Sequence, residues 1–266
     1  MILLVDIVEI NNKLGNGSTH PYVVWCNDGN KYVAKFPGNP EREKSLVNEF
    51  ICSKLCSYLE LPIMPYELIN VRLDNYKQEM LEDDILLLEG TAFGTIYDDR
   101  LVLVLNSDSI KKTMNHNDAV KILIFDLLIG NNDRNRGNLM INSNSKELIM
   151  IDHTHIFNIG VVWDEWQLAR LETEPFDTSR LNRFNYVNLI NSFVFNSAFY
   201  SELDDFIDKV KSITEEIVEI FLEDLPEDWN ISSNEKKAIV SFVVNRFHRV
   251  DEVLELLNLR GGDSSE

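Results

Sequence analysis

The hydrophobic pattern of this 266-residue chain changes near residue 106, and this change restricts the possible folds more than any other property. Before this point, short apolar runs alternate with turn signals such as Asn16-Gly17 and Asn27-Asp28-Gly29, which indicates β-strands. After it, apolar residues recur at helical spacings over long stretches. Strands followed by helices predict an α+β fold of two lobes. We expect an N-terminal lobe over 1–105, a C-terminal lobe over 106–260 and a disordered tail over 261–266.

The N-terminal half is predicted to form an antiparallel sheet with one helix. Strand-like runs occupy residues 2–10, 22–26 and 31–36, and the short turns between them favour a meander. The pattern becomes helical from about 41 to 59, and the prolines that follow end this helix. Two further apolar runs, 85–88 and 101–105, are expected to be buried strands that flank a Gly-containing connection over 89–94.

The C-terminal half is predicted to be mainly helical. Asn117 can cap a core helix that runs to residue 129, and Gly130 can end it. A polar loop and a short hairpin of strands 139–141 and 148–151 come next. Further helices are expected at about 185–199, 202–223 and 233–258. The tryptophans of this half are expected to pack in the core or between the lobes: Trp163, Trp166 and Trp229.

Composition and charge exclude several classes of protein. The chain has 44 Asp and Glu against 25 Lys and Arg, and a net charge of −19 opposes the phosphate contacts that dominate nucleic-acid binding. No uncharged apolar run reaches the ~18 residues that a membrane span needs. The first residues lack the basic region of a signal peptide. We therefore expect a cytoplasmic protein that contacts neither nucleic acid nor membrane.

Many of the acidic residues lie in the predicted C-terminal helices. They are expected to form a solvated face, and a basic protein partner is the alternative. The residues concerned are Glu202, Asp204, Asp205, Asp208, Glu215, Glu216 and Glu219.

The polar loop over 130–138 carries the strongest sign of chemistry. Its Asp133 and Asn138 are five residues apart, the spacing with which kinase catalytic loops present a base and a metal ligand. The spacing alone carries no weight, because it occurs four times in the chain, for example at Asp126 and Asn131. What distinguishes this pair is its context: a core helix before it, then a hairpin, and Asp152 at the end of a buried strand.

This arrangement suits phosphoryl transfer, which needs orientation and charge neutralisation more than covalent chemistry. We expect Asp133 to orient the acceptor hydroxyl. Asn138 and Asp152 offer the oxygen ligands that Mg²⁺ prefers. The alternative for these isolated residues is structural, with Asp133 and Asn138 capping a turn and Asp152 capping a helix start.

A second group of candidates lies in the N-terminal half. Lys35 is on a predicted strand and Glu49 on the helix that follows, and such a pair can hold the phosphates of ATP. Glu43, on the same helix, is a competing partner for Lys35. We also expect Phe93, within the Gly-containing stretch, to contact the nucleotide.

The turn after the first strand is a weaker candidate for binding phosphate. Gly15, Gly17 and Ser18 begin like the phosphate-binding pattern G-x-G-x-x-G, but His20 stands where the third glycine belongs. A plain hairpin turn is the equal alternative.

Taken together, these residues resemble the HipA-like kinases, and in particular the short stand-alone branch of that family. The loop is similar to the family pattern N-x-D-R-x-x-x-N, and Ile151-Asp152-His153 to the motif that replaces D-F-G of other kinases. Further motifs of the family have counterparts elsewhere in the chain, in the same order as in the family. They are Lys35, Val47-Asn48-Glu49, Leu61-Pro62-Ile63-Met64-Pro65 and Leu225-Pro226-Glu227-Asp228-Trp229.

The resemblance implies a two-lobed protein-kinase-like fold that binds ATP and Mg²⁺ and transfers the γ-phosphoryl group to a Ser or Thr hydroxyl of a protein substrate. A small-molecule hydroxyl is an alternative acceptor, because no peptide-docking groove is predicted. A nucleotide-binding pseudokinase that acts as a regulatory module is an alternative of another class. The loop-phosphorylation habit of some relatives implies autophosphorylation at Ser18 or Thr19. Residues from Leu139 onward show no recognisable activation segment with a phosphosite.

Overall fold

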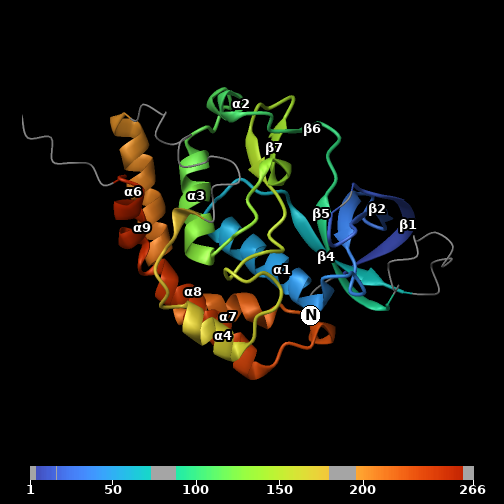
Figure 1. Ribbon diagram of the computed structural model, residues 1–266. Helices are drawn as coiled ribbons and strands as arrows, with labels where there is room; N and C mark the ends of the chain where they lie inside the picture. Colours follow the sequence, from blue (N-terminus) through green and yellow to red (C-terminus); the bar gives the residue numbers. More distant parts are fainter. Residues whose placement is uncertain (1–3, 16, 73–87, 180–195, 260–266) are drawn as a thin grey trace, which may run out of the picture.

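The computed structural model of the chain describes residues 4–15, 17–72, 88–179 and 196–259 (Figure 1). Strands dominate the N-terminal part and helices the C-terminal part, so the predicted α+β class is confirmed. Helix α1 (Arg42–Tyr58) packs against strand β5 on one side and helix α7 on the other, which places it between the two parts. The division at residue 106 stays a prediction, and the predicted tail over 261–266 lies outside the described residues.

The N-terminal strands form a closed barrel. Their order around it is β1 (Val5–Lys13), β2 (Tyr22–Cys26), β3 (Lys31–Lys35), β5 (Gly90–Ile96) and β4 (Tyr66–Val71). The predicted antiparallel meander of the first three strands is confirmed. Closure of the barrel was not predicted, and it comes from a short parallel pairing in which Val5 lies opposite Ile69 and Asp6 opposite Asn70.

The prediction of a connection over 89–94 was wrong, because these residues begin strand β5, which lies between β3 and β4. The glycine that suggested a connection serves close packing instead. A Cβ atom on Gly94 would lie 2.3 Å from Cδ1 of Ile69 and 3.3 Å from Cβ of Tyr32. A side chain at this position would therefore require Ile69 to move. Most of the predicted strand 85–88 lies outside the described residues.

The C-terminal part combines a small sheet with helices. The sheet has the antiparallel order β6 (Leu101–Leu103), β7 (Leu139–Asn142) and β8 (Leu148–Met150), so the predicted hairpin is confirmed. The predicted strand is confirmed over Leu101–Leu103, but its expected burial was wrong for Val102, Leu103 and Leu105, which are 49%, 54% and 72% exposed, whereas Val104 is buried. The helices and short 3₁₀ turns are α2 (Ser107–Lys111), α3 (Asp118–Ile129), η3 (Arg136–Asn138), α4 (Glu165–Leu171), α6 (Ser197–Lys211), α7 (Glu215–Glu223), η5 (Glu227–Trp229), α8 (Ser233–Phe247) and α9 (Val250–Leu256).

Two predicted helices are each divided in two. The stretch 202–223 breaks before α7, where the Thr214 side chain accepts a hydrogen bond from Ile217 and caps the new helix. The stretch 233–258 breaks between α8 and α9. The predicted helix 185–199 overlaps the start of α6, and residues 185–195 lie outside the description. The acidic residues that were expected on a solvated face of α6 and α7 are exposed.

Helix α3 is the centre of the core and leads to the polar loop. Its residues from Ala119 to Ile129 are almost all buried, and it packs against α8 and α9. Gly130 ends it in the left-handed conformation, with φ 71°, as predicted. The predicted cap is wrong, because the Asn117 side chain donates to Glu202 instead of capping α3.

The tryptophans divide between core and surface. Trp163 and Trp229 are 1% exposed, as expected, whereas Trp166 is 78% exposed on α4. Of the helices that the structure describes, none has both the length and the apolar composition needed to cross a membrane.

Candidate active site

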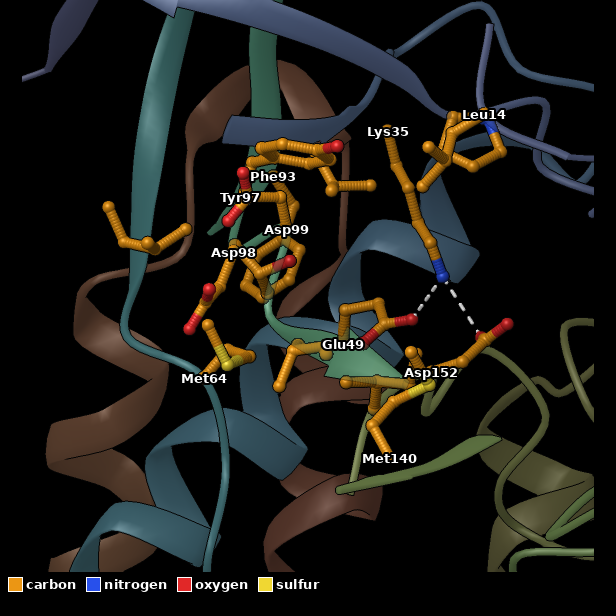
Figure 2. Close-up of a pocket in the computed structure, with 16 residues that line it drawn as sticks. Leu14, Lys35, Glu49, Met64, Phe93, Tyr97, Asp98, Asp99, Met140 and Asp152 are labelled. Atoms are coloured by element: carbon orange, nitrogen blue, oxygen red, sulfur yellow. Dashed lines mark hydrogen bonds and ion pairs between the residues drawn. The ribbon is translucent and has the colours of Figure 1, made fainter. Parts of the chain in front are cut away.

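A cavity of about 330 Å³ lies between the barrel and the small sheet (Figure 2). Val33, Lys35 and Phe93 line it from the barrel, and Met140 and Ile151 line it from the opposite side. The connection from β5 to β6 closes one end with Tyr97, Asp98 and Asp99. Mostly apolar walls with a few convergent polar groups are typical of sites for small ligands.

Three charged side chains meet at the other end of the cavity. Lys35, the last residue of β3, points its ammonium between two carboxylates (Figure 2). Nζ donates to Glu49 and lies 2.9 Å from Oδ1 of Asp152 and 2.9 Å from Oγ1 of Thr154. Lys35 and Glu49 are 8% and 3% exposed, so their attraction is weakly screened by solvent. The structure therefore brings together Lys35, Glu49, Phe93 and Asp152 in the wall of one cavity.

The charges in this cluster stabilise one another. Burial alone would lower the pKa of Lys35, but the carboxylates of Asp152 and Glu49 outweigh it and raise that pKa. Burial would likewise raise the pKa of Asp152 and of Glu49, and the Lys35 ammonium outweighs it and holds both pKa values below their usual range. All three groups are therefore charged at neutral pH.

Helix α1 selects Glu49, not Glu43, as the partner of Lys35. Glu49 lies on the buried face of α1, and its Oε1 also accepts from the backbone N–H of His153, at 3.0 Å, and from Oγ1 of Thr154, at 3.1 Å. Glu43 lies in the first turn of the helix and is only half-buried. The helix thereby joins the strand lysine to the segment that follows Asp152.

The polar loop is held in place by a buried arginine. Arg134 donates to both carboxylate oxygens of Asp126 on α3, at 2.9 and 3.1 Å. Its Nη1 also donates to the carbonyl oxygens of Asn138 and Ile151, each at 2.8 Å. A buried ion pair is stable where further hydrogen bonds satisfy its remaining donors, as they do here. Arg134 thus fixes Asn138 beside the residue that precedes Asp152.

Sequence reasoning missed the role of Asp126. Its spacing to Asn131 served only as an example of chance, yet Asn131 donates its side-chain amide to Oδ1 of Asp126 at 2.9 Å. The backbone N–H of Asp133 then donates to Oδ1 of Asn131 at 3.0 Å. The available signal was an acid within an apolar helix, because a buried carboxylate needs a partner such as Arg134.

Asn138 and Asp152 offer oxygen atoms suited to a magnesium ion. The Asn138 amide nitrogen donates to the carbonyl oxygen of Asp133 at 2.8 Å, which leaves its amide oxygen as a ligand atom. The Asp152 side chain is 36% exposed, and its backbone adopts φ 58°, a conformation that is costly outside glycine and recurs at functional sites. Within the described residues, no group of three or more acidic, His or Cys side chains is arranged so that it could hold a metal ion. The set fits Mg²⁺, which binds few carboxylates and keeps waters and phosphates as ligands.

Only the two ends of the connection between β1 and β2 lie in the cavity wall. Leu14 and Pro21, on either side of the turn, line the cavity, whereas Gly15, Gly17 and Ser18 are exposed and do not. The backbone N–H of Leu14 donates to Pro21 at 2.8 Å and that of His20 to Gly17 at 3.0 Å, which is a hairpin connection. A phosphate-binding role for Gly15, Gly17 and Ser18 stays a prediction.

The barrel carries a strand lysine that pairs with a helix glutamate. The helical part carries a polar loop and a carboxylate that follows a strand. Together these features define the protein-kinase-like class of folds. The chain belongs to the HipA-like kinase family, whose sequence model matches residues 7–168. A second model, described as phosphatidylinositol 3- and 4-kinase, matches residues 116–223. The resemblance to HipA-like kinases and the predicted fold are thereby confirmed.

One solved structure agrees with this fold. The crystal structure of a Helicobacter pylori proinflammatory kinase, CtkA, is similar with a TM-score of 0.57 and 14% identity, over 98% of this chain and 100% of that one. The Golgi casein kinase has a TM-score of 0.47 and 14% identity, over 98% of this chain and 73% of that one. A search among curated protein sequences found no match. At such identities the likeness concerns the fold alone.

Proposed function

We propose that this chain is an ATP-dependent kinase that transfers the γ-phosphoryl group to a Ser or Thr hydroxyl of a protein. The observation that carries the proposal is the position of Lys35 in the wall of the cavity, between the carboxylates of Glu49 and Asp152. A lysine in this setting keeps its charge and presents it to the cavity, where the phosphates of ATP need it. Family membership supports phosphoryl transfer as the type of reaction.

Each polar residue then has a role. Lys35 binds phosphate oxygens, and Glu49 orients Lys35. Asp133 accepts a hydrogen bond from the acceptor hydroxyl and takes its proton while the new O–P bond forms and the bond to ADP breaks. Asn138 and Asp152 would hold Mg²⁺, which neutralises phosphate charge when bound. The apolar walls around Val33, Met140 and Ile151 suit the base of the nucleotide.

The test is transfer of labelled γ-phosphate from ATP, with Mg²⁺, to protein acceptors. We expect the wild-type protein to label Ser or Thr residues and the Asp133→Asn variant to lose this activity by a factor of about 10² to 10⁴, the usual contribution of a general base. A wild-type protein that binds ATP without consuming it would be a regulatory nucleotide-binding module instead.

A hydroxyl on a small molecule or lipid is the second candidate acceptor. The observation that favours it is the match of the phosphatidylinositol 3- and 4-kinase model to residues 116–223, a stretch that contains the polar loop and Asp152. Parallel assays with mixed proteins and with vesicles containing phosphatidylinositol separate the two acceptors. Label in the lipid fraction alone would overturn the protein substrate while leaving the kinase reaction in place.

A further inference from the structure

A fully buried amide joins helix α1 to the segment that follows Asp152. Asn48 is 0% exposed. Its side-chain nitrogen donates to the carbonyl oxygens of Thr154 at 2.7 Å and Gly160 at 3.1 Å, and its side-chain oxygen accepts from Nε1 of Trp163 at 3.0 Å. Both N–H groups of the amide and its oxygen are therefore used, all on residues 154–163, and none on α1 itself.

Two neighbours of Asn48 extend this connection. The Glu49 carboxylate accepts from the N–H of His153 and the hydroxyl of Thr154, so Asn48 and Glu49 bind the same residue, one at its carbonyl oxygen and the other at its hydroxyl. One turn earlier on α1, Lys44 donates to the carbonyl oxygen of Trp163 and lies 4.2 Å from the centre of its ring. Lys44 also forms an ion pair with Glu235 at 2.8 Å, at the start of α8. The helix is thus fixed along its length to the C-terminal part.

These contacts concern the position of α1, on which the pairing of Lys35 with Glu49 depends. In protein kinases that pair must be in place for phosphoryl transfer, and activation commonly acts by moving the helix that carries the glutamate. Phosphorylation of the segment after the metal-binding acid is one such control. Here residues 153–163, which Asn48 and Glu49 contact, contain a single hydroxyl residue, Thr154. It is 1% exposed and hydrogen-bonded to Lys35 and Glu49, so a modifying enzyme cannot reach it.

We infer that Asn48 is a positioning residue that holds α1 against residues 154–163, so that the pair Lys35–Glu49 stays assembled without phosphorylation of residues 153–163. The Asn48 amide would thus hold the helix in place through its hydrogen bonds, as a phosphate group does in kinases that are activated by phosphorylation. The inference rests on the proposed function, because it concerns how the same site is kept ready for the reaction.

Two variants test the role of the amide. Asn48→Ala removes the three hydrogen bonds and leaves their partners unpaired in the core. Asn48→Asp keeps the size and the acceptor for Trp163, but places a carboxylate oxygen against the carbonyl oxygens of Thr154 and Gly160. We expect kcat/KM for ATP to fall at least about tenfold in both variants, because loosening α1 lets Glu49 leave Lys35.

A matched control separates positioning from general stability. Asn115 also bridges two segments through its side-chain amide, which donates to Asp118 and to the carbonyl oxygen of Leu148, each at 3.0 Å, and accepts from the N–H of Leu148 at 2.7 Å. Asn115→Ala should lower the melting temperature and change kcat/KM for ATP by less than about twofold, since it lies outside α1 and the segment 153–163. If Asn48→Ala shifts only the melting temperature in the same way, its role is structural and the inference fails.

Coupling to Glu49 provides a second readout. If Asn48 acts through Glu49, Asn48→Ala should weaken ATP binding in the wild-type background and have no further effect on it in a Glu49→Gln background. Additive losses of ATP affinity would contradict the inference. In addition, wild-type protein treated with a phosphatase should keep its activity, and loss of activity on dephosphorylation would overturn it.

Amide hydrogen exchange tests the inference without measuring any activity. A failure of the inference can therefore be distinguished from a failure of the proposed function. A wild-type protein that transfers no phosphate would refute the function alone. Asn48→Ala should increase exchange in peptides from α1 and from residues 153–163, with little change in β2 and β3. Unchanged exchange in α1 would show that Asn48 does not hold this helix and would overturn the inference.

Discussion

The Lys35 ammonium neutralises the carboxylates of both Glu49 and Asp152, so its removal should change the free energy of unfolding. In the Lys35→Met variant, Glu49 stays buried without its cation, which should cost about 3–5 kcal/mol of unfolding free energy at neutral pH. Burial then raises the pKa of Glu49, so the folded variant binds a proton more readily than the unfolded chain. The variant should therefore regain stability as the pH falls from about 8 to about 5.

The wild type should behave in the opposite sense. The pKa values of Glu49 and Asp152 are lowered in the folded state, so their contribution to stability is complete above the usual carboxyl range and is lost as the pH falls below that range, through the lowered folded-state values. Urea unfolding of both proteins from about pH 8 to about pH 2 covers both windows and measures the difference. Parallel pH profiles would contradict the ion cluster.

The roles of the remaining polar residues separate by phenotype. Asp133→Asn should keep nucleotide affinity and lose transfer, because Asp133 acts on the acceptor. Asn138→Ala and Asp152→Asn should weaken the complex with Mg²⁺ and ATP itself, because these residues hold the metal. Calorimetry and transfer assays on the three variants, with folding checked by circular dichroism, decide the matter. Equal loss of ATP affinity in all three would show that the roles are assigned wrongly.

At the scale of single elements, strand β5 carries a prediction of its own. Gly94→Ala would place a Cβ atom 2.3 Å from Cδ1 of the buried Ile69, and overpacking of this kind costs about 1–3 kcal/mol. Ile69→Val removes Cδ1, so the double variant should recover part of the loss. Denaturant unfolding of the two single variants and the double variant measures this. If the losses of unfolding free energy in the two single variants simply add in the double variant, the packing between Gly94 and Ile69 is looser than described.

The turn between β1 and β2 carries a second prediction at this scale. Ser18 is exposed and Thr19 is 3% exposed, so any autophosphorylation of this turn should occur at Ser18. A phosphate on Ser18 would add a charge of about −1.5 to −2 beside the cavity that is proposed to bind ATP. Repulsion between this charge and the phosphates of ATP should inhibit nucleotide binding. Peptide mass spectrometry after incubation with ATP and Mg²⁺ gives the site. Phosphate on Thr19 alone would contradict the burial.

Several elements could be predicted from the sequence because their signals are local. The periodicity of α1 and α3, Gly130 at the end of α3, and the strands before Asp152 lie in continuous stretches of chain. The sequence around Gly94 predicted a connection because glycine is typical of turns, whereas here the glycine lies within a strand and allows close packing. The roles of Arg134 and Asn48 depend on partners far away in sequence, such as Ile151 and Gly160, and no local pattern contains that information.

At the scale of the whole molecule, the turn η5 of the C-terminal part contacts strand β5 of the barrel. Both oxygens of Asp228 accept from Thr91, from its N–H at 2.6 Å and its hydroxyl at 3.1 Å, and Nε1 of Trp229 donates to the Thr91 carbonyl oxygen at 2.7 Å. Strand β3 ends before it reaches Thr91, so these residues of the Leu-Pro-Glu-Asp-Trp motif satisfy the backbone of β5 there. The motif thereby joins the barrel to the helical part.

Asp228→Ala should remove this connection at a cost of about 1–3 kcal/mol of unfolding free energy, because the Thr91 N–H loses its acceptor. Glu227→Ala is the matched control, since Glu227 is exposed in the same turn. Unfolding by urea compares the two. Equal stability of the two variants would show that the contact with Thr91 contributes nothing.

In the proposed function, the cavity between the barrel and the small sheet binds ATP through Lys35 and a magnesium ion held by Asn138 and Asp152. Calorimetric titration of ATP into the protein, with Mg²⁺ and then with the metal chelated by EDTA, tests it most directly. Despite the net charge of −19, binding is expected with Mg²⁺, because screening over about 8–10 Å leaves the local charges to decide. The affinity should fall sharply when the metal is removed and also in Lys35→Met. Equally tight binding in EDTA, or no binding with Mg²⁺, would contradict the claim.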